Sequence, residues 1–90
     1  MTTHRKAKMK LTIELTHYPF KDDYRPVIKE TVERLNAIEG IDVQTFPTAT
    51  VLVGEYDTLM QILNDTMKWS FETYGKCVFV AKFIPGYEAL

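Results

Sequence analysis

The sequence predicts an α+β fold whose strands and helices follow the order β-α-β-β-α-β. Two observations lead to this prediction: short segments alternate apolar and polar residues, and two longer segments repeat apolar residues at helical spacing, with glycine or proline between them. Residues 9–84 are expected to form one domain, residues 1–8 to be disordered, and residues 85–90 to form a C-terminal tail. A domain this small buries little surface, so association would stabilise it.

The first element is a strand that leads into an aromatic junction. Residues 9–16 alternate apolar with polar side chains, which is typical of a half-buried strand. Thr16 is expected to close the strand, and Pro19 to turn the chain toward a helix. The rings of Tyr18 and Phe20 are thereby left at the junction.

A first helix is expected to follow and to end at Gly40. Asp22 or Asp23 can cap its start, and Pro26 is tolerated in its first turn. Its apolar side chains recur along one stripe, which consists of Tyr24, Ile28, Val32 (or Thr31), Leu35 and Ile38.

Two short strands are expected next, in residues 41–46 and 49–53. Pro47 interrupts the apolar pattern between them, and Gly54 ends the second of the two. A hairpin is the most economical connection for strands this close in sequence.

A second helix is expected to begin at a cap, Asp57, and to end at Gly75. Its apolar side chains are Leu59, Met60, Leu63, Met67, Phe71 and Tyr74. Residues 76–83 then predict a final strand, which Pro85 and Gly86 stop.

Together these elements match the ferredoxin-like arrangement, a four-stranded antiparallel sheet with two helices on one face. The third and fourth predicted strands are apolar on both faces, with Leu52 alternating with Val51 and Val53 in the third. An apolar surface left uncovered on a small domain indicates an interface. We therefore expect a homo-oligomer, either a homodimer or a homotetramer, packed through its sheets.

Charge and hydropathy argue against two classes of partner. Residues 1–10 contain four basic residues and no acidic one, which gives this segment a charge of +4. Because the whole chain has a net charge of −1, residues 11–90 carry −5. An acidic body repels phosphate, and we expect no nucleic-acid partner. Because no apolar run could span a bilayer and no secretory pattern opens the chain, we expect no membrane partner and a cytoplasmic location.

Catalytic and metal-binding signals are weak. His17 could form an acid-base pair with Glu14 or Asp23, but a lone histidine at a strand end is more often a spectator. His4, His17 and Cys77 are scattered along the sequence, and no phosphate loop or nucleophile motif is present. We expect no catalytic residue, no metal and no cofactor.

Aromatic content favours a ligand pocket instead. Eleven of the 90 residues are aromatic, which is more than a small core needs, and several lie at the ends of predicted elements. Aromatic faces with a few polar anchors suit a flat, cationic heterocycle.

Two segments carry a resemblance to a known family. The segment "IELTHYPFKDDYRPVIKETVERL", residues 13–35, resembles the opening of the YkoF-type thiamine/hydroxymethylpyrimidine-binding family, in which a strand enters a Tyr-Pro segment and then a helix. The segment "FPTATVLVGEYDTLMQIL", residues 46–63, is similar to that family's small-hydroxyl strand, which is followed by glycine, an acidic residue and a helix. The resemblance covers residues 11–83. It implies a ferredoxin-like domain that oligomerises through its sheets and binds thiamine or its pyrimidine part without catalysis.

The resemblance also implies a site, because Tyr18 matches the Tyr-Pro landmark while Thr48 and Thr50 match the small-hydroxyl strand. Aromatic side chains would stack on or wall the heteroaromatic ring, threonine hydroxyls would bind ring nitrogens or an exocyclic amine, and a carboxylate would balance a thiazolium charge. The candidate stacking residues are Tyr18, Phe20 and Trp69. The candidate hydrogen-bonding residues are Thr48 and Thr50, and the candidate counter-charge is Glu14.

Two other classes of function stay open. A cofactor-independent oxygenase or isomerase of the dimeric ferredoxin-like type would need His17 or a tyrosine as proton acceptor. A regulatory module resembling amino-acid-sensing domains would hold its ligand at a subunit interface or have none.

Overall fold

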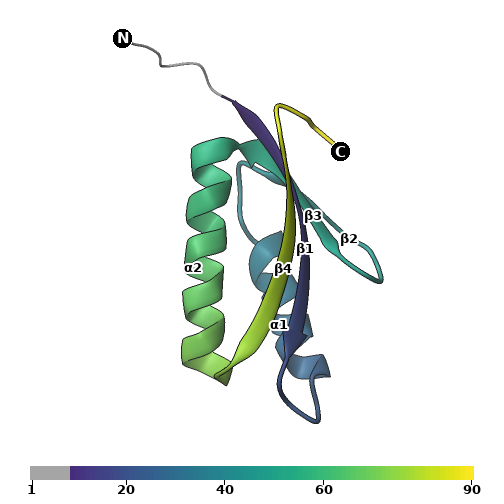
Figure 1. Ribbon diagram of the computed structural model, residues 1–90, viewed down its shortest axis with the longest axis vertical. Helices are drawn as coiled ribbons and strands as arrows, with labels where there is room; N and C mark the ends of the chain where they lie inside the picture. Colours follow the sequence, from purple (N-terminus) through teal and green to yellow (C-terminus); the bar gives the residue numbers. More distant parts are fainter. Residues whose placement is uncertain (1–8) are drawn as a thin grey trace.

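The computed structural model describes residues 9–90 and has the predicted order of elements. These are β1 (Lys10–Pro19), α1 (Arg25–Asn36), β2 (Asp42–Thr45), β3 (Thr50–Glu55), α2 (Tyr56–Tyr74) and β4 (Cys77–Pro85). The strands form one antiparallel sheet in the order β2-β3-β1-β4, which can be followed in Figure 1. The ferredoxin-like α+β fold is thus confirmed, while the expected disorder of residues 1–8 lies outside the described residues.

The core lies between the sheet and the two helices. Alternate residues of β1, namely Leu11, Ile13 and Leu15, are buried and point toward the helices, as their spacing predicted. They pack in one cluster with Leu52 of β3 and with the helix residues Leu35, Leu59 and Leu63. This packing places both helices on the same face of the sheet.

Strand β1 is longer than the sequence predicted. Thr16 does not close it, and Pro19 is its last residue rather than the start of the turn. The reason is that β4 continues to pair with β1 after the pairing with β3 stops at Leu15. His17 lies opposite Phe79, and Pro19 lies opposite Cys77. Since side chains alternate along a strand, the extension puts His17 on the same face as Leu15.

The helices also begin differently from the prediction. Tyr24, not Asp22 or Asp23, occupies the N-cap position of α1, and it forms no capping hydrogen bond with its side chain. Because β1 extends to Pro19, the two aspartates fall in the loop that follows it.

Helix α2 follows β3 without a loop, so Glu55 rather than Asp57 takes its N-cap position. Glu55 is still paired with Lys10 of β1, and the backbone N–H of Tyr56 donates to the carbonyl oxygen of Met9 at 2.8 Å. This pairing carries β3 through Gly54, where the sequence predicted its end. Asp57 lies in the first helical turn, where a negative charge favours the helix dipole.

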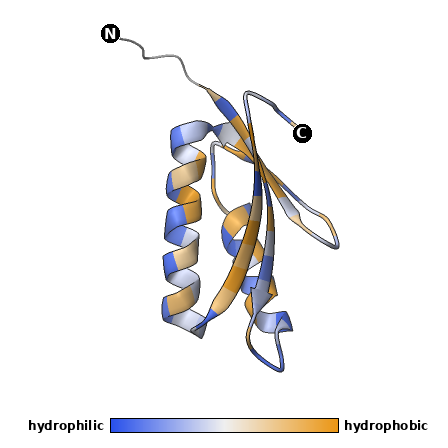
Figure 2. Cartoon of the chain, viewed as in Figure 1, coloured by the Kyte–Doolittle hydropathy of each residue, from blue (hydrophilic) through white to orange (hydrophobic). Residues whose placement is uncertain are grey.

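We call the sheet face opposite the helices the open face. Its exposed apolar side chains are Tyr18 of β1 and Val78, Val80 and Ile84 of β4. Figure 2 shows that most of β4 is apolar along its length. One ion pair crosses the open face, with 3.6 Å between Lys82 Nζ and Glu14 Oε1.

The C-terminal tail is held against one end of the open face. The Thr12 hydroxyl donates to the carbonyl oxygen of Tyr87 at 2.6 Å and accepts from the N–H of Ala89 at 3.1 Å. The N–H of Gly86 also donates to the carbonyl oxygen of Lys10 at 2.6 Å. Thr12 is therefore buried although it points away from the helices.

Candidate functional site

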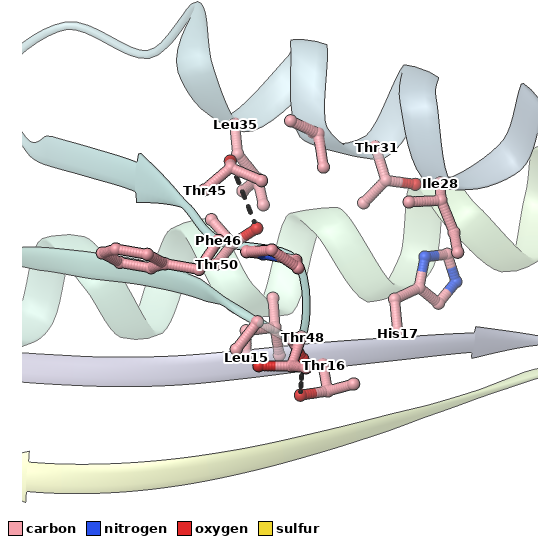
Figure 3. A pocket seen from close by; sticks show the side chains of 13 residues that line it. Leu15, Thr16, His17, Ile28, Thr31, Leu35, Thr45, Phe46, Thr48 and Thr50 are labelled. Carbon is pink, nitrogen blue, oxygen red and sulfur yellow. Dashed lines mark hydrogen bonds between the residues drawn. The ribbon is translucent and has the colours of Figure 1, made fainter. Parts of the chain in front are cut away.

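A pocket of about 110 Å³ lies between β1, helix α1 and the β2–β3 hairpin (Figure 3). Leu15, Ile28 and Leu35 contribute apolar walls, and residues 45–50 of the hairpin form the opposite side. A dry cavity of about 150 Å³ holds a benzene molecule in a well-studied protein. At about 110 Å³ the pocket is smaller than that cavity, so it has room for at most one aromatic ring.

The hairpin that closes this side of the pocket is held by its own backbone. The N–H of Phe46 donates to the carbonyl oxygen of Ala49 at 2.8 Å, and Pro47 and Thr48 lie between them. Phe46 lines the pocket and is half exposed, so the one aromatic side chain that the hairpin contributes is also accessible to solvent. This geometry suits a wall that a ligand can displace.

Threonine hydroxyls supply much of the polarity of the pocket, and several already donate to the protein. The Thr31 hydroxyl donates to the carbonyl oxygen of Val27 at 2.8 Å, and the Thr16 hydroxyl donates to that of Thr48 at 3.1 Å. Thr45 and Thr50 bond to each other at 3.4 Å, so one of these two hydroxyls also donates within the pair. Their oxygens keep accepting lone pairs, which suit the N–H groups of a ligand amine.

His17 is the titratable side chain of the pocket, and Figure 3 shows its ring pointing from β1 toward Thr31 and Ile28. The ring stacks on Phe79, and its Nε2 atom lies 3.4 Å from Ser70 Oγ. Its Nδ1 atom is buried and has no hydrogen-bond partner among residues 9–90. Desolvation by burial lowers the pKa of His17 from its ordinary value of 6.5, so the neutral imidazole is favoured.

Two of the six predicted ligand-binding residues lie at this pocket. Thr48 and Thr50 both line it. Glu14 and Tyr18 lie on the open face, which the sheet separates from the pocket, because they pair with Lys82 and Val78 of β4.

The structure does not bring the remaining two predicted residues, Phe20 and Trp69, to the pocket either. Phe20 is exposed after the end of β1, with Lys76 Nζ 5.7 Å from the centre of its ring. Trp69 lies on α2, where the Arg34 guanidinium is 4.8 Å from its ring centre and Tyr74 meets it edge-on. Tyr18, Phe20 and Trp69 therefore do not form the aromatic walls of one site with Thr48 and Thr50.

Sequence reasoning treated His17 as a spectator and considered Thr31 only as an alternative member of the apolar stripe. The alternation of β1 held the missing signal, since continuing it by two residues from Leu15 places His17 on the helix face. The second signal is Thr31, a hydroxyl-bearing residue in the buried stripe of α1, where apolar residues are usual. A polar side chain at such a position can mark a pocket.

Comparisons with known proteins indicate the fold. No family model matches the chain, and no curated protein matches it. A provisionally assigned thiamine biosynthesis/salvage protein from Thermotoga maritima has a similar structure, with a TM-score of 0.75 and 21% sequence identity over 89% of this chain and 85% of that one.

Two further solved structures are similar. A Streptococcus pneumoniae protein of no stated function has a TM-score of 0.77 and 26% identity over 83% of this chain and 84% of that one. A hypothetical protein from Methanocaldococcus jannascii has a TM-score of 0.72 and 18% identity over 83% of this chain and 78% of that one. The chain is thus similar in fold to proteins of comparable length.

Residues 9–90 contain no group of three or more histidine, cysteine, aspartate or glutamate residues placed to hold a metal ion. Neither α1 nor α2 is long and apolar enough to cross a membrane.

Proposed function

We propose that this chain binds a single-ring heteroaromatic molecule, the hydroxymethylpyrimidine moiety of thiamine or thiamine itself, and does not transform it. The observation that carries this proposal is the pocket, which has room for at most one ring, apolar walls and a set of threonine hydroxyls. The similarity in fold to the Thermotoga maritima protein, which is provisionally assigned to thiamine biosynthesis or salvage, supports the same class of ligand.

The charge of the pocket favours the pyrimidine over intact thiamine. Its described lining residues include no carboxylate, and Glu14, which the sequence suggested as a counter-charge, lies on the open face. The thiazolium ring of thiamine is positive and would extend beyond a pocket of one-ring size. We therefore expect hydroxymethylpyrimidine to bind at least as tightly as thiamine.

The proposal that the chain is not an enzyme rests on the surroundings of His17. The carboxylate of Glu14 cannot assist this imidazole, because the sheet separates them, and the groups that contact the ring are Phe79 and Ser70. These contacts give His17 no carboxylate to orient its ring or to stabilise an imidazolium ion, which is the support that a histidine base has in a catalytic triad.

We further propose that the protein acts as an oligomer packed through its open faces. Tyr18, Val78, Val80 and Ile84 expose apolar surface on one side of the sheet. Covering such a surface would add apolar burial that a domain of 90 residues lacks. The pocket lies on the other side of the sheet, so this packing would leave it accessible.

Calorimetric titration with hydroxymethylpyrimidine, thiamine and the thiazole moiety alone tests the ligand. We expect saturable binding of the first two and none of the third. Ala49→Leu, which adds bulk to the pocket lining, is expected to abolish binding, whereas the matched control Trp69→Phe on α2 leaves it unchanged. Absence of heat with every ligand at millimolar concentration would overturn the proposal, and turnover of the ligand would overturn its non-catalytic part.

A further inference from the structure

The ring of His17 is held in one orientation by contacts from two elements. Phe79 of β4 stacks against it with 4.2 Å between ring centres and 5° between ring planes. The Oγ atom of Ser70 in α2 lies 3.4 Å from the Nε2 atom of His17. The Nδ1 atom cannot reach another partner without breaking these contacts, so its direction is a fixed feature of the pocket.

The contact with Ser70 continues to a thiol. Ser70 is fully buried, and its Oγ atom lies 3.5 Å from Sγ of Cys77 as well as within reach of His17. Its hydroxyl has a single hydrogen, which it can donate to only one of these neighbours. The distances alone allow donation in either direction along this chain. Because a thiol sulfur is a weak acceptor, the favoured direction is from the Ser70 hydroxyl to His17 Nε2 and from the Cys77 thiol to Ser70 Oγ.

This direction of donation determines the tautomer of His17. A neutral imidazole carries one hydrogen, and a nitrogen that accepts a hydrogen bond does not hold it. With Nε2 accepting from Ser70, the hydrogen is on Nδ1. Burial keeps the ring neutral, as the lowered pKa of His17 indicates.

The Nδ1–H group is then a buried donor that lacks an acceptor among the described residues, at a side chain that lines the pocket. Leaving such a donor unpaired costs free energy, and native proteins rarely do so without a functional reason. The Thr31 hydroxyl donates to Val27 and keeps accepting lone pairs, but it forms no hydrogen bond with Nδ1. A ligand that brings an acceptor into the pocket would satisfy the donor.

We propose that His17 Nδ1–H donates a hydrogen bond to an unprotonated ring nitrogen of the ligand, and that Ser70 and Cys77 are positioning residues that fix this tautomer. This inference rests on the proposed function and specifies its chemistry. The preferred ligand is a six-membered nitrogen heterocycle bearing an amine. Its ring nitrogen accepts from His17, and its amine hydrogens bond to the threonine oxygens of the pocket.

The test compares four ligands: hydroxymethylpyrimidine, its two aminopyridine analogues, each with one ring nitrogen replaced by CH, and the aniline analogue with both replaced. Calorimetry is carried out at about pH 8, above the ordinary histidine pKa. The native protein is expected to lose about tenfold or more in affinity when the accepting nitrogen is removed. His17→Phe, which keeps an aromatic ring against Phe79, is expected to bind all four ligands with similar affinity.

The tautomer is measured independently on the native protein by nitrogen-15 NMR of the imidazole. We expect hydrogen on Nδ1 in the free protein and a shift of that signal when hydroxymethylpyrimidine binds. Ser70→Ala is expected to produce a mixture of tautomers and to weaken binding by several-fold. Thr66→Val, which removes another buried hydroxyl of α2 one turn away, is the matched control and should change neither.

The possible results distinguish a failure of the role proposed for His17 from a failure of the proposed ligand binding. If the native protein binds none of the ligands, the proposed function fails. If it binds them but His17→Phe retains the same preference for the ring nitrogen, the role of His17 is wrong. If NMR finds hydrogen on Nε2 in the free protein, the relay from Cys77 through Ser70 is wrong, whether or not the variants fold.

Discussion

His17 and Phe79 are directly opposite each other on β1 and β4, and their rings stack almost parallel, with 4.2 Å between centres. This pair forms where β1 extends beyond the end of β3, at the edge of the pocket. A cross-strand aromatic pair stabilises a sheet, and this one also presents a polar atom to a cavity.

The stability of the protein is expected to depend on pH through His17. Burial lowers its pKa in the folded protein below the 6.5 of the unfolded chain, so the unfolded state binds more protons. The contribution is fully present above pH 6.5 and is lost as pH falls toward the folded-state pKa. Urea unfolding at a series of pH values should show a slope from this group of at most about 1.4 kcal/mol per pH unit.

The control for this dependence is His17→Phe, which keeps a stacking ring but does not titrate. The part of the slope that lies just below pH 6.5 should disappear in the variant. An unchanged pH profile would show that His17 is as easily protonated in the folded state as in the unfolded one.

Thr12→Val is expected to release the C-terminal tail. The substitution keeps the shape of a buried side chain and removes its bonds to Tyr87 and Ala89. We expect the free energy of unfolding to fall by about 1 kcal/mol, and the amide of Ala89 to exchange its hydrogen faster. Thr73→Val, at an exposed position of α2, is the control and should leave both unchanged.

Gly54→Ala is expected to destabilise the fold although Gly54 is within a regular strand. An added Cβ would lie 3.0 Å from Cγ2 of Ile41 and 3.5 Å from Leu59 Cδ2. Overpacking of this kind costs about 1–3 kcal/mol. In a double-mutant cycle, Ile41→Ala removes the obstructing methyl, so the pair should cost less than the sum of the single changes. Strict additivity would mean that the Cβ is accommodated elsewhere.

Val80→Glu is expected to separate the subunits if the open face is an interface. Val80 is 51% exposed in the single chain, and a carboxylate there would have to be desolvated on association. Sedimentation should find the variant monomeric at concentrations where the native protein is oligomeric, with unchanged affinity for hydroxymethylpyrimidine. Phe71→Glu, on the exposed side of α2, should not alter assembly; if it does, the interface is on the helices.

The fold was predictable because its signals are local and agree with one another. The alternation of Leu11, Ile13 and Leu15 identified the core face of β1, and Gly75 correctly marked the end of α2. The extension of β1 was not predictable, since it depends on pairing with a strand about sixty residues later. The alternation of β1 can be continued to His17, but no pattern within residues 16–20 shows that the strand itself continues.

The site was only partly predictable for the same reason. Thr48 and Thr50, which lie in one short segment, both line the pocket, and their binding of a ligand stays a prediction. Tyr18 and Glu14 were expected at the pocket, but the pleat of β1 turns both to the open face. The position of His17 at the pocket was not predictable, because its neighbours Phe79 and Ser70 come from distant parts of the sequence.

The tail contact at Thr12 also has a consequence for the order of folding. It joins residues 75 and 77 positions apart, nearly the full length of the described chain. Contacts of such long range form late because the loop between them must first be closed by other structure, here the pairing of β4 with β1. A fluorescent label attached at Leu90 would therefore report the last step of chain collapse rather than the formation of the core.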